Sequence, residues 1–132
     1  MGQAILSGNS VPTNYTVLYH NEDGVDGEFT LSESANNFKR IGIYYFSNNL
    51  NFQNYTEMFN INKPSTNGAT LQVIYPNAGG TNFYIRCAYA HINNTQFILG
   101  RNYGISIIPT GTVATDNTGI KVYEVHGIER II

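Results

Sequence analysis

The chain lacks tryptophan and contains a single cysteine, Cys87, among its 132 residues. One cysteine cannot form an intramolecular disulfide, so a hydrophobic core has to stabilise the fold. A chain of this length with 42% hydrophobic residues can bury such a core without a disulfide or a metal. Because Cys87 lies in the apolar run FYIRCAYA, we expect it to be a small buried residue.

Charged residues are also scarce, since they make up 12% of the chain and only 7 residues are Lys or Arg. These cations are spread along the sequence and form no basic stripe, which argues against nucleic-acid binding. No apolar run approaches the roughly 20 residues of a membrane-spanning helix, so we expect no membrane insertion. Residues 1–10 lack a basic start and a long apolar region, and therefore predict no signal peptide.

The sequence is rich in tyrosine and phenylalanine, with 10 Tyr and 7 Phe beside many Asn, Ser and Thr residues. This composition predicts an all-β protein with a polar, uncharged surface. The clearest strand lies at the end of segment 31–46, LSESANNFKRIGIYYF, where Ile41, Ile43 and Tyr45 share one face. We expect this strand at the centre of a sheet, after a bend over 32–37 that is at most one helical turn.

Further strand-like segments recur at short intervals, separated by turns rich in Gly, Pro and Asn. They are 15–20, 28–31, 55–61, 70–75, 82–92, 96–99, 103–108 and 120–128. Segment 21–27 predicts a hairpin that joins the first two strands, and segment 110–119 predicts a loop. The pattern favours an antiparallel β-sandwich, jelly-roll-like, of about eight or more short strands, with a barrel as the alternative. Residues 1–14 are expected to be a lead-in, and residues 15–132 a single domain.

The sequence contains no clear motif for catalysis or for a metal. His20, His91 and His126 lie in or beside different strands and lack the spacing of a metal motif such as H-E-x-x-H. A G-x-S-x-G nucleophile elbow is absent as well. A glycosidase needs two carboxylates that face each other, and the sequence does not show that any two acidic residues do so. Segment 22–28 is acidic but lacks the alternating pattern of a calcium-binding loop. We therefore expect a non-catalytic protein with no cofactor and no metal.

Tyrosines beside Asn and Arg are the strongest indication of a ligand. Sugar-binding sites stack an aromatic face against the apolar side of a pyranose and add hydrogen bonds from Asn, Arg or Gln. On this basis the expected ligand-binding residues are Tyr44, Tyr84, Arg86, Tyr89, His91, Asn93, Arg101 and Tyr103. The alternative for each tyrosine is a structural role, because Tyr is a favoured strand residue that covers sheet faces.

Two stretches near opposite ends of the chain are similar to a known family. Residues 30–34 (TLSES), 37–38 (NF) and 41–45 (IGIYY) together resemble a segment in C-terminal domains of bacteriophage tail fibres and related receptor-binding proteins. Residues 120–130, IKVYEVHGIER, resemble the strand with which such chains end. The middle of the chain, 51–118, has no such likeness, so the resemblance supplies no site residues.

The resemblance implies a β-sandwich head at the tip of a homotrimeric fibre, located in the virion, that binds bacterial surface polysaccharide or a receptor protein without catalysis. The apolar residues Ile128, Ile131 and Ile132 fit a trimer, because burying each of them is worth about 1.5–3 kcal/mol. They could be buried against a neighbouring subunit or back on the domain. Two other functions stay open: a structural virion or assembly domain for fibre joining or capsid decoration, and a carbohydrate-binding module or small glycan-active enzyme outside phage.

Overall fold

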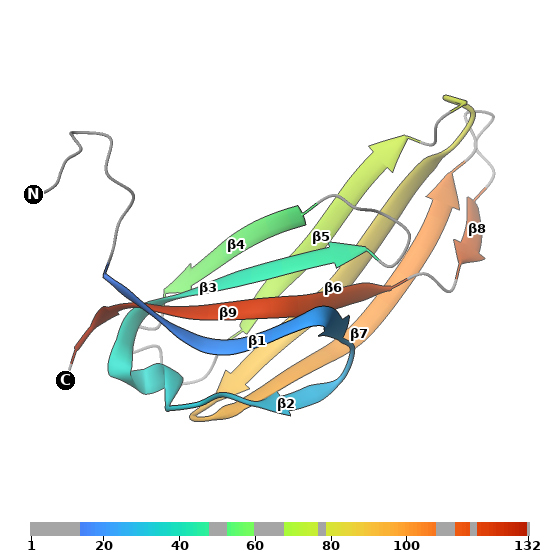
Figure 1. Ribbon diagram of the computed structural model, residues 1–132. Coiled ribbons are helices and arrows are strands. Elements are labelled where there is room, and N and C mark those ends of the chain that lie inside the picture. The colour runs from blue at the N-terminus through green and yellow to red at the C-terminus, as the bar shows by residue number, and fades with distance from the viewer. Residues whose placement is uncertain are drawn as a thin grey trace, which may run out of the picture.

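The computed structural model describes residues 14–47, 53–59, 68–76, 79–107, 113–116 and 119–131. In these residues two antiparallel sheets pack face to face (Figure 1), which confirms the predicted β-sandwich. The elements are β1 (Tyr15–Val25), β2 (Glu28–Thr30), the 3-10 turn η1 (Ala35–Asn37), β3 (Phe38–Ser47), β4 (Gln53–Phe59), β5 (Gly68–Pro76), β6 (Phe83–Asn93), β7 (Gln96–Ile107), β8 (Val113–Asp116) and β9 (Ile120–Arg130). Sheet A has the strand order β1-β9-β3-β4. Sheet B has the order β2-β7-β6-β5, with β8 paired to β7.

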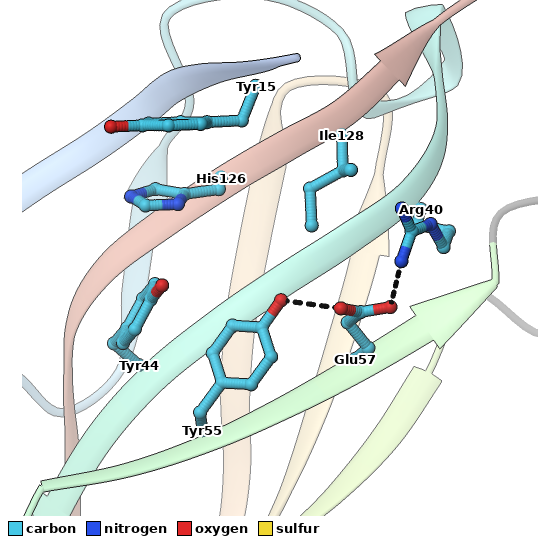
Figure 2. Close-up of a pocket in the computed structure, with 7 residues that line it drawn as sticks. All are labelled: Tyr15, Arg40, Tyr44, Tyr55, Glu57, His126 and Ile128. Carbon is cyan, nitrogen blue, oxygen red and sulfur yellow. Dashed lines mark hydrogen bonds and ion pairs between the residues drawn. The ribbon is translucent and has the colours of Figure 1, made fainter. Parts of the chain in front are cut away.

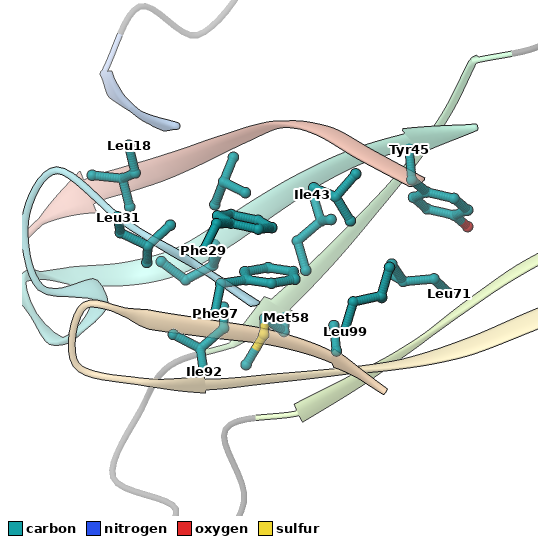
Figure 3. Close-up of a cluster of buried hydrophobic side chains, with 14 of the residues drawn as sticks. Leu18, Phe29, Leu31, Ile43, Tyr45, Met58, Leu71, Ile92, Phe97 and Leu99 are labelled. Carbon is teal, nitrogen blue, oxygen red and sulfur yellow. The ribbon is translucent and has the colours of Figure 1, made fainter. Parts of the chain in front are cut away.

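The hydrophobic core lies between the two sheets, where alternate residues of each strand point inward (Figure 3). Ile41 and Ile43 of β3 are fully buried, as their alternation in the sequence predicted, and Leu71 of β5 packs from the opposite sheet. Aromatic rings fill one end of the core, where Phe29 of β2 stacks on Phe97 of β7 at 4.5 Å between ring centroids. Two sheets joined in this way bury their apolar faces against each other, which is the main stabilising term of a sandwich.

The last strand closes sheet A by lying between the first strand and the predicted central strand. β9 pairs with β1, where Tyr15 faces Ile128, and on its other side pairs with β3 along most of its length. The expectation that segment 41–45 lies inside a sheet is confirmed, because β3 has β9 and β4 as neighbours. The two ends of the described chain therefore meet in the same sheet.

A glycine on the core side of β9 allows this close packing. A Cβ atom on Gly127 would lie 2.5 Å from the ring of Phe38, which is fully buried at the start of β3. No real side chain tolerates that distance, so any larger residue would push the ring out of the core. The other face of the Phe38 ring lies 4.7 Å from the Arg130 guanidinium, a cation–π contact.

The predicted hairpin between the first two strands is wrong. β1 continues to Val25, where it pairs with Val122 of β9, whereas β2 pairs with β7 in the other sheet. The turn-rich segment instead carries the chain from one sheet to the other, and Gly27 with φ 119° makes the crossing. Burial explains the outcome, because in sheet B the buried ring of Phe29 stacks on Phe97 of β7 and also on Tyr19 of β1 in the facing sheet. β1, β2 and β3 thus alternate between the sheets, as in a jelly roll.

The second half of the chain differs from the sequence prediction in two places. The predicted strands 96–99 and 103–108 are one strand, β7, which has a register shift opposite residues 87–89 of β6. A bulge of this kind lets a strand stay paired although the alternation of its side chains is broken. Segment 110–119 was predicted as a loop, yet its residues 113–116 form the short edge strand β8.

The two ends of the described chain lie close to each other in sheet A. Of the predicted lead-in, 1–14, only Asn14 is described, and its carbonyl accepts a hydrogen bond from the Glu129 amide at 3.0 Å. Ile128 is buried within its own domain, Ile131 is half exposed, and Ile132 lies outside the described residues. Nowhere in the described ranges does the chain form a helix with the length and apolarity needed to cross a membrane.

An ion pair ties the polar bend before β3 to the end of β9. Both oxygens of Glu33 accept hydrogen bonds from Arg130, at 2.7 and 2.8 Å, and Asn37 donates a third at 2.9 Å. These bonds from Arg130 and then Asn37 lower the pKa of the Glu33 carboxyl to about 2. The predicted polar bend over 32–37 is confirmed, with η1 as its single helical turn.

Replacing Glu33 by Gln should make the melting temperature less sensitive to acid. Because the folded state lowers the pKa from 4.5 to about 2, the Glu33 carboxylate stabilises the fold above pH 4.5. That contribution is lost as pH falls through this window. We expect the difference in melting temperature between wild type and Glu33→Gln to be constant above pH 4.5 and to shrink toward pH 2. A difference that stays constant over the whole range would contradict the ion pair.

Candidate functional site

A pocket of about 340 Å³ opens on the outer face of sheet A (Figure 2). All four strands of the sheet contribute to it. Its lining residues are Tyr15 of β1, Arg40 and Tyr44 of β3, Tyr55 and Glu57 of β4, and His126 and Ile128 of β9. Small-molecule pockets have volumes of about 300–1,000 Å³, so this one has room for a single ring or a ligand of similar size.

The register of sheet A brings these side chains together around a glycine. Gly42 of β3 lies directly between His126 of β9 and Glu57 of β4. Arg40 and Tyr44 are two residues away along β3 and therefore point to the same outer face. Because Gly42 has no side chain, the ring of Tyr55 can lie across it and reach Glu57.

Four rings from four strands form one side of the pocket, which we call the aromatic wall: Tyr15, His126, Tyr44 and Tyr55. Tyr15 stacks on His126 with ring centroids 4.5 Å apart and an angle of 15° between the planes. Tyr44 meets the edge of His126 at 4.8 Å and lies 4.7 Å from Tyr55. The four rings therefore pack against one another in a row, and Tyr15 and Tyr55 at its two ends are the most exposed, at 46% and 43%.

A hydrogen-bonded network forms the other side of the pocket. Glu57 accepts hydrogen bonds at 2.8 Å from both Arg40 and the Tyr55 hydroxyl, each to a different carboxylate oxygen. Arg40 donates in addition to Glu129 at 3.2 Å. Burial and the bond to Glu57 raise the pKa of Tyr55 far above its ordinary value, so its hydroxyl stays protonated. The bond to Glu57 likewise raises the pKa of Arg40.

His126 is held in the aromatic wall by a carboxylate outside the pocket. Glu124 forms a short hydrogen bond to His126, and its second oxygen lies 2.6 Å from Nδ1 of His20. Burial raises the pKa of Glu124, but the bonds to His126 and His20 outweigh this effect and leave the pKa below its ordinary value. Glu124 therefore carries a negative charge at neutral pH and fixes the orientation of the imidazole ring.

The pocket can stack a flat apolar group and bond to hydroxyl groups at the same time. Its aromatic wall supplies the stacking surface, and Glu57 and Arg40 supply acceptors and donors next to it. Within the part of the chain that the structure describes, no cluster of three or more His, Cys, Asp or Glu side chains could hold a metal ion.

Tyr44 is the one residue of the predicted site that lines this pocket. Tyr89, His91 and Asn93 belong to β6 in sheet B, where Tyr89 stacks with His91 at 6.3 Å. Tyr84 is half-buried, also on β6, and lies 5.0 Å from Tyr75. The sequence prediction therefore combined residues from two different sheets into one site.

The prediction of a ligand-binding role for Arg86 is wrong, because its side chain is 1% exposed. It donates a hydrogen bond to the carbonyl of Ile105 at 3.1 Å and lies 4.9 Å from the ring of Tyr84. Cys87, its neighbour on the opposite face of β6, is half-buried rather than fully buried. The alternation on β6 was predicted correctly, but the face that carries Arg86 is the one that points into the core.

Two more of the predicted residues cannot be placed in or out of a site. Arg101 and Tyr103 belong to β7 by their backbone, and Tyr103 pairs with Cys87. Their side chains lie outside the described residues. Their predicted contact with a ligand stays a prediction.

The sequence analysis missed six of the seven lining residues: Tyr15, Arg40, Tyr55, Glu57, His126 and Ile128. One signal was available, since a glycine inside the clearest strand often marks a place where another group approaches closely. That signal points to Gly42 but does not name its cross-strand neighbours. Those neighbours depend on the pairing of β3 with β4 and β9, which the sequence does not specify.

Comparisons of the chain with protein-family models, with curated proteins and with solved structures found no match. The geometry of the pocket is therefore the main evidence for what it binds.

Two glycines of sheet A offer a matched test of how rigid the pocket is. A Cβ on Gly42 would lie 2.5 Å from the Tyr55 hydroxyl, but Tyr55 is well exposed and can swing outward. We expect Gly42→Ala to change the free energy of unfolding by less than about 1 kcal/mol. Gly127→Ala should cost about 1–3 kcal/mol, because the buried ring of Phe38 cannot move aside.

Urea denaturation of both variants measures this difference. Nuclear magnetic resonance chemical shifts of the Tyr55 ring should change in Gly42→Ala and stay near their wild-type values in Gly127→Ala. Equal losses of stability in the two variants would show that Tyr55 is held as firmly as Phe38.

Proposed function

We propose that this chain is a non-catalytic carbohydrate-binding domain that holds a sugar unit in the pocket of sheet A. The observation that carries the proposal is the aromatic wall beside the Arg40–Glu57 pair, on an open face of a rigid sheet. One face of a pyranose is apolar and stacks on aromatic rings, while its hydroxyl groups bond strongly to charged partners. Both kinds of contact are available within this pocket.

We further propose that the domain is the receptor-binding head of a bacteriophage tail fibre and that the sugar belongs to host surface polysaccharide. The support is the resemblance of residues 30–34, 37–38, 41–45 and 120–130 to such heads. These segments include part of β3 and all of β9, two of the four strands that line the pocket. In this proposal the domain lies at the fibre tip of the virion, where the outer face of sheet A would be accessible to the host cell.

A matched pair of tyrosines tests the proposed site. Tyr15 and Tyr89 are similarly exposed, at 46% and 39%, and each stacks on a histidine, but they lie on different sheets. We expect Tyr15→Ala to weaken binding of the labelled domain to bacterial cells at least tenfold. Tyr89→Ala should leave binding within about twofold of wild type. Tyr89 lies on sheet B, away from the proposed site, and a substitution of one exposed residue there should have a small effect.

The measurement is binding of the fluorescently labelled chain to a panel of bacterial strains, including mutants that lack surface polysaccharide. Binding that is confined to a few strains and is lost with the polysaccharide would support a receptor-binding head. Binding that survives Tyr15→Ala but not Tyr89→Ala would move the site to sheet B. If the folded domain bound no strain and no glycan, a structural role in the virion would be favoured.

The outer face of sheet B favours a second proposal, that the domain assembles into a homotrimer. Two neighbouring rows on this face carry no charge and align the side chains of Ile74, Ile85, Ile105, Pro76, Phe83, Ile107 and Val113. Ile74, Phe83 and Val113 are 64%, 48% and 58% exposed in the single chain. A contiguous apolar patch of this kind is typical of a protein–protein interface.

Sedimentation at micromolar concentration tests the trimer. We expect wild type to sediment as a trimer and Ile74→Lys to sediment as a monomer, because a lysine within an apolar interface has to be desolvated. Val17→Lys provides the control, since Val17 is also exposed but belongs to sheet A. A monomeric mass for wild type would contradict the proposal.

A further inference from the structure

We infer that the pocket of sheet A selects an uncharged sugar unit and rejects acidic sugars such as uronic acids. This inference rests on the proposed function and names the class of ligand. It follows from the way in which Arg40, the one Arg or Lys among the described residues that line the pocket, is already neutralised. Three observations lead to it: the partners of Arg40, the free bonding capacity of Glu57, and the surplus of carboxylates around both.

The positive charge of Arg40 is already compensated by two carboxylates of its own sheet. Its Nη1 atom donates to Glu57 at 2.8 Å and its Nη2 atom donates to Glu129 at 3.2 Å. Both partners belong to neighbouring strands of the same sheet, so the guanidinium is held between them. The remaining N–H groups can donate to sugar hydroxyls, but the carboxylate of an acidic sugar would be the third negative charge beside a single cation.

Glu57 retains the capacity to bond sugar hydroxyl groups. A carboxylate offers about four lone-pair positions, and Arg40 and Tyr55 each use one of them, on different oxygens. The remaining positions can accept hydrogen bonds from two neighbouring hydroxyls of a sugar ring. They cannot accept anything from a second carboxylate, which has no proton to donate at neutral pH.

The charge around the pocket adds a repulsion to this lack of partners. Besides Glu57 and Glu129, the charged Glu124 bonds His126 of the aromatic wall. Among the described residues, the lining of the pocket and its direct bonding partners thus carry three carboxylates and one guanidinium. His126 and His20 both contact Glu124. Dissolved salt screens the repulsion between charges, so the selectivity should be clearest at low salt.

Matched sugars and a pair of charge variants test the inference with the full chain. The probes are methyl glycosides of glucose, galactose and mannose and of the three uronic acids that differ from them only at C6. A printed array of neutral and uronic-acid-containing bacterial polysaccharides complements them. We expect every sugar that binds to do so at least tenfold more tightly in its neutral form, at pH 8 and low salt.

Glu129→Gln removes one carboxylate that holds Arg40, and Glu28→Gln makes the same change of net charge in sheet B, where Glu28 bonds Gln96. The ratio of neutral to acidic affinity should fall at least threefold in Glu129→Gln and should keep its wild-type value in Glu28→Gln. Equal ratios in the two variants would overturn the role of the Arg40 network.

Two other outcomes separate the inference from the proposal on which it rests. If acidic sugars bound as tightly as neutral ones, or more tightly, the selectivity would be refuted while sugar binding stood. If no member of either set bound the folded chain, the proposed function would fail and the inference with it. In the supportive outcome, binding moves chemical shifts of Tyr15, Tyr44 and Tyr55 and not those of Tyr89.

Discussion

The pairing of β9 with β3 is the constraint on which the rest of the structure depends. It joins the last strand of the chain to the predicted central strand. Because β9 also pairs with β1 on its other side, the first strand is held in the same sheet. On the inner side the pairing places Val125 opposite Ile43 in the core, and on the outer side it places His126 opposite Gly42 in the pocket. Because successive residues of a strand point to opposite faces, one register determines both. A slip by one residue would turn the core side chains outward and dismantle the pocket in the same step.

Local sequence was sufficient to predict the elements that depend on composition and alternation. The face of β3 that carries Ile41 and Ile43 is buried as predicted, and the polar bend before it holds one helical turn. The errors lie where long-range contacts decide. Segment 21–27 has the residues of a hairpin, yet the gain from stacking Phe29 on Phe97 draws the following strand into the other sheet. Turn propensity is a weak term compared with burial of an aromatic side chain.

The site was harder to predict than the fold, for a physical reason. A pocket on a sheet consists of residues that are adjacent across strands, and the pairing of four strands is not visible in any one of them. Tyr44 was found because an aromatic residue on the open face of a clear strand is conspicuous. Arg86 was misplaced because a charged residue is expected at the surface, whereas this guanidinium bonds a backbone carbonyl and packs on Tyr84 inside the sandwich. Its long side chain can place hydrogen bonds and apolar contacts in the same buried space.

The two outer faces of the sandwich differ in chemistry, and in the proposed function this difference would place recognition on one face and assembly on the other. Sheet A carries the charged and aromatic groups around Gly42, whereas the rows of sheet B near Ile74 and Phe83 carry no charge. An assembly that used sheet B would bury apolar surface and leave the pocket of sheet A open, so neither role would obstruct the other. Several copies held side by side would then present several pockets to one polysaccharide. A single small pocket can bind a sugar only weakly, and linking equal sites raises overall affinity without any new contact. Selectivity for an uncharged sugar would be multiplied in the same way, because each copy repeats the neutralised Arg40.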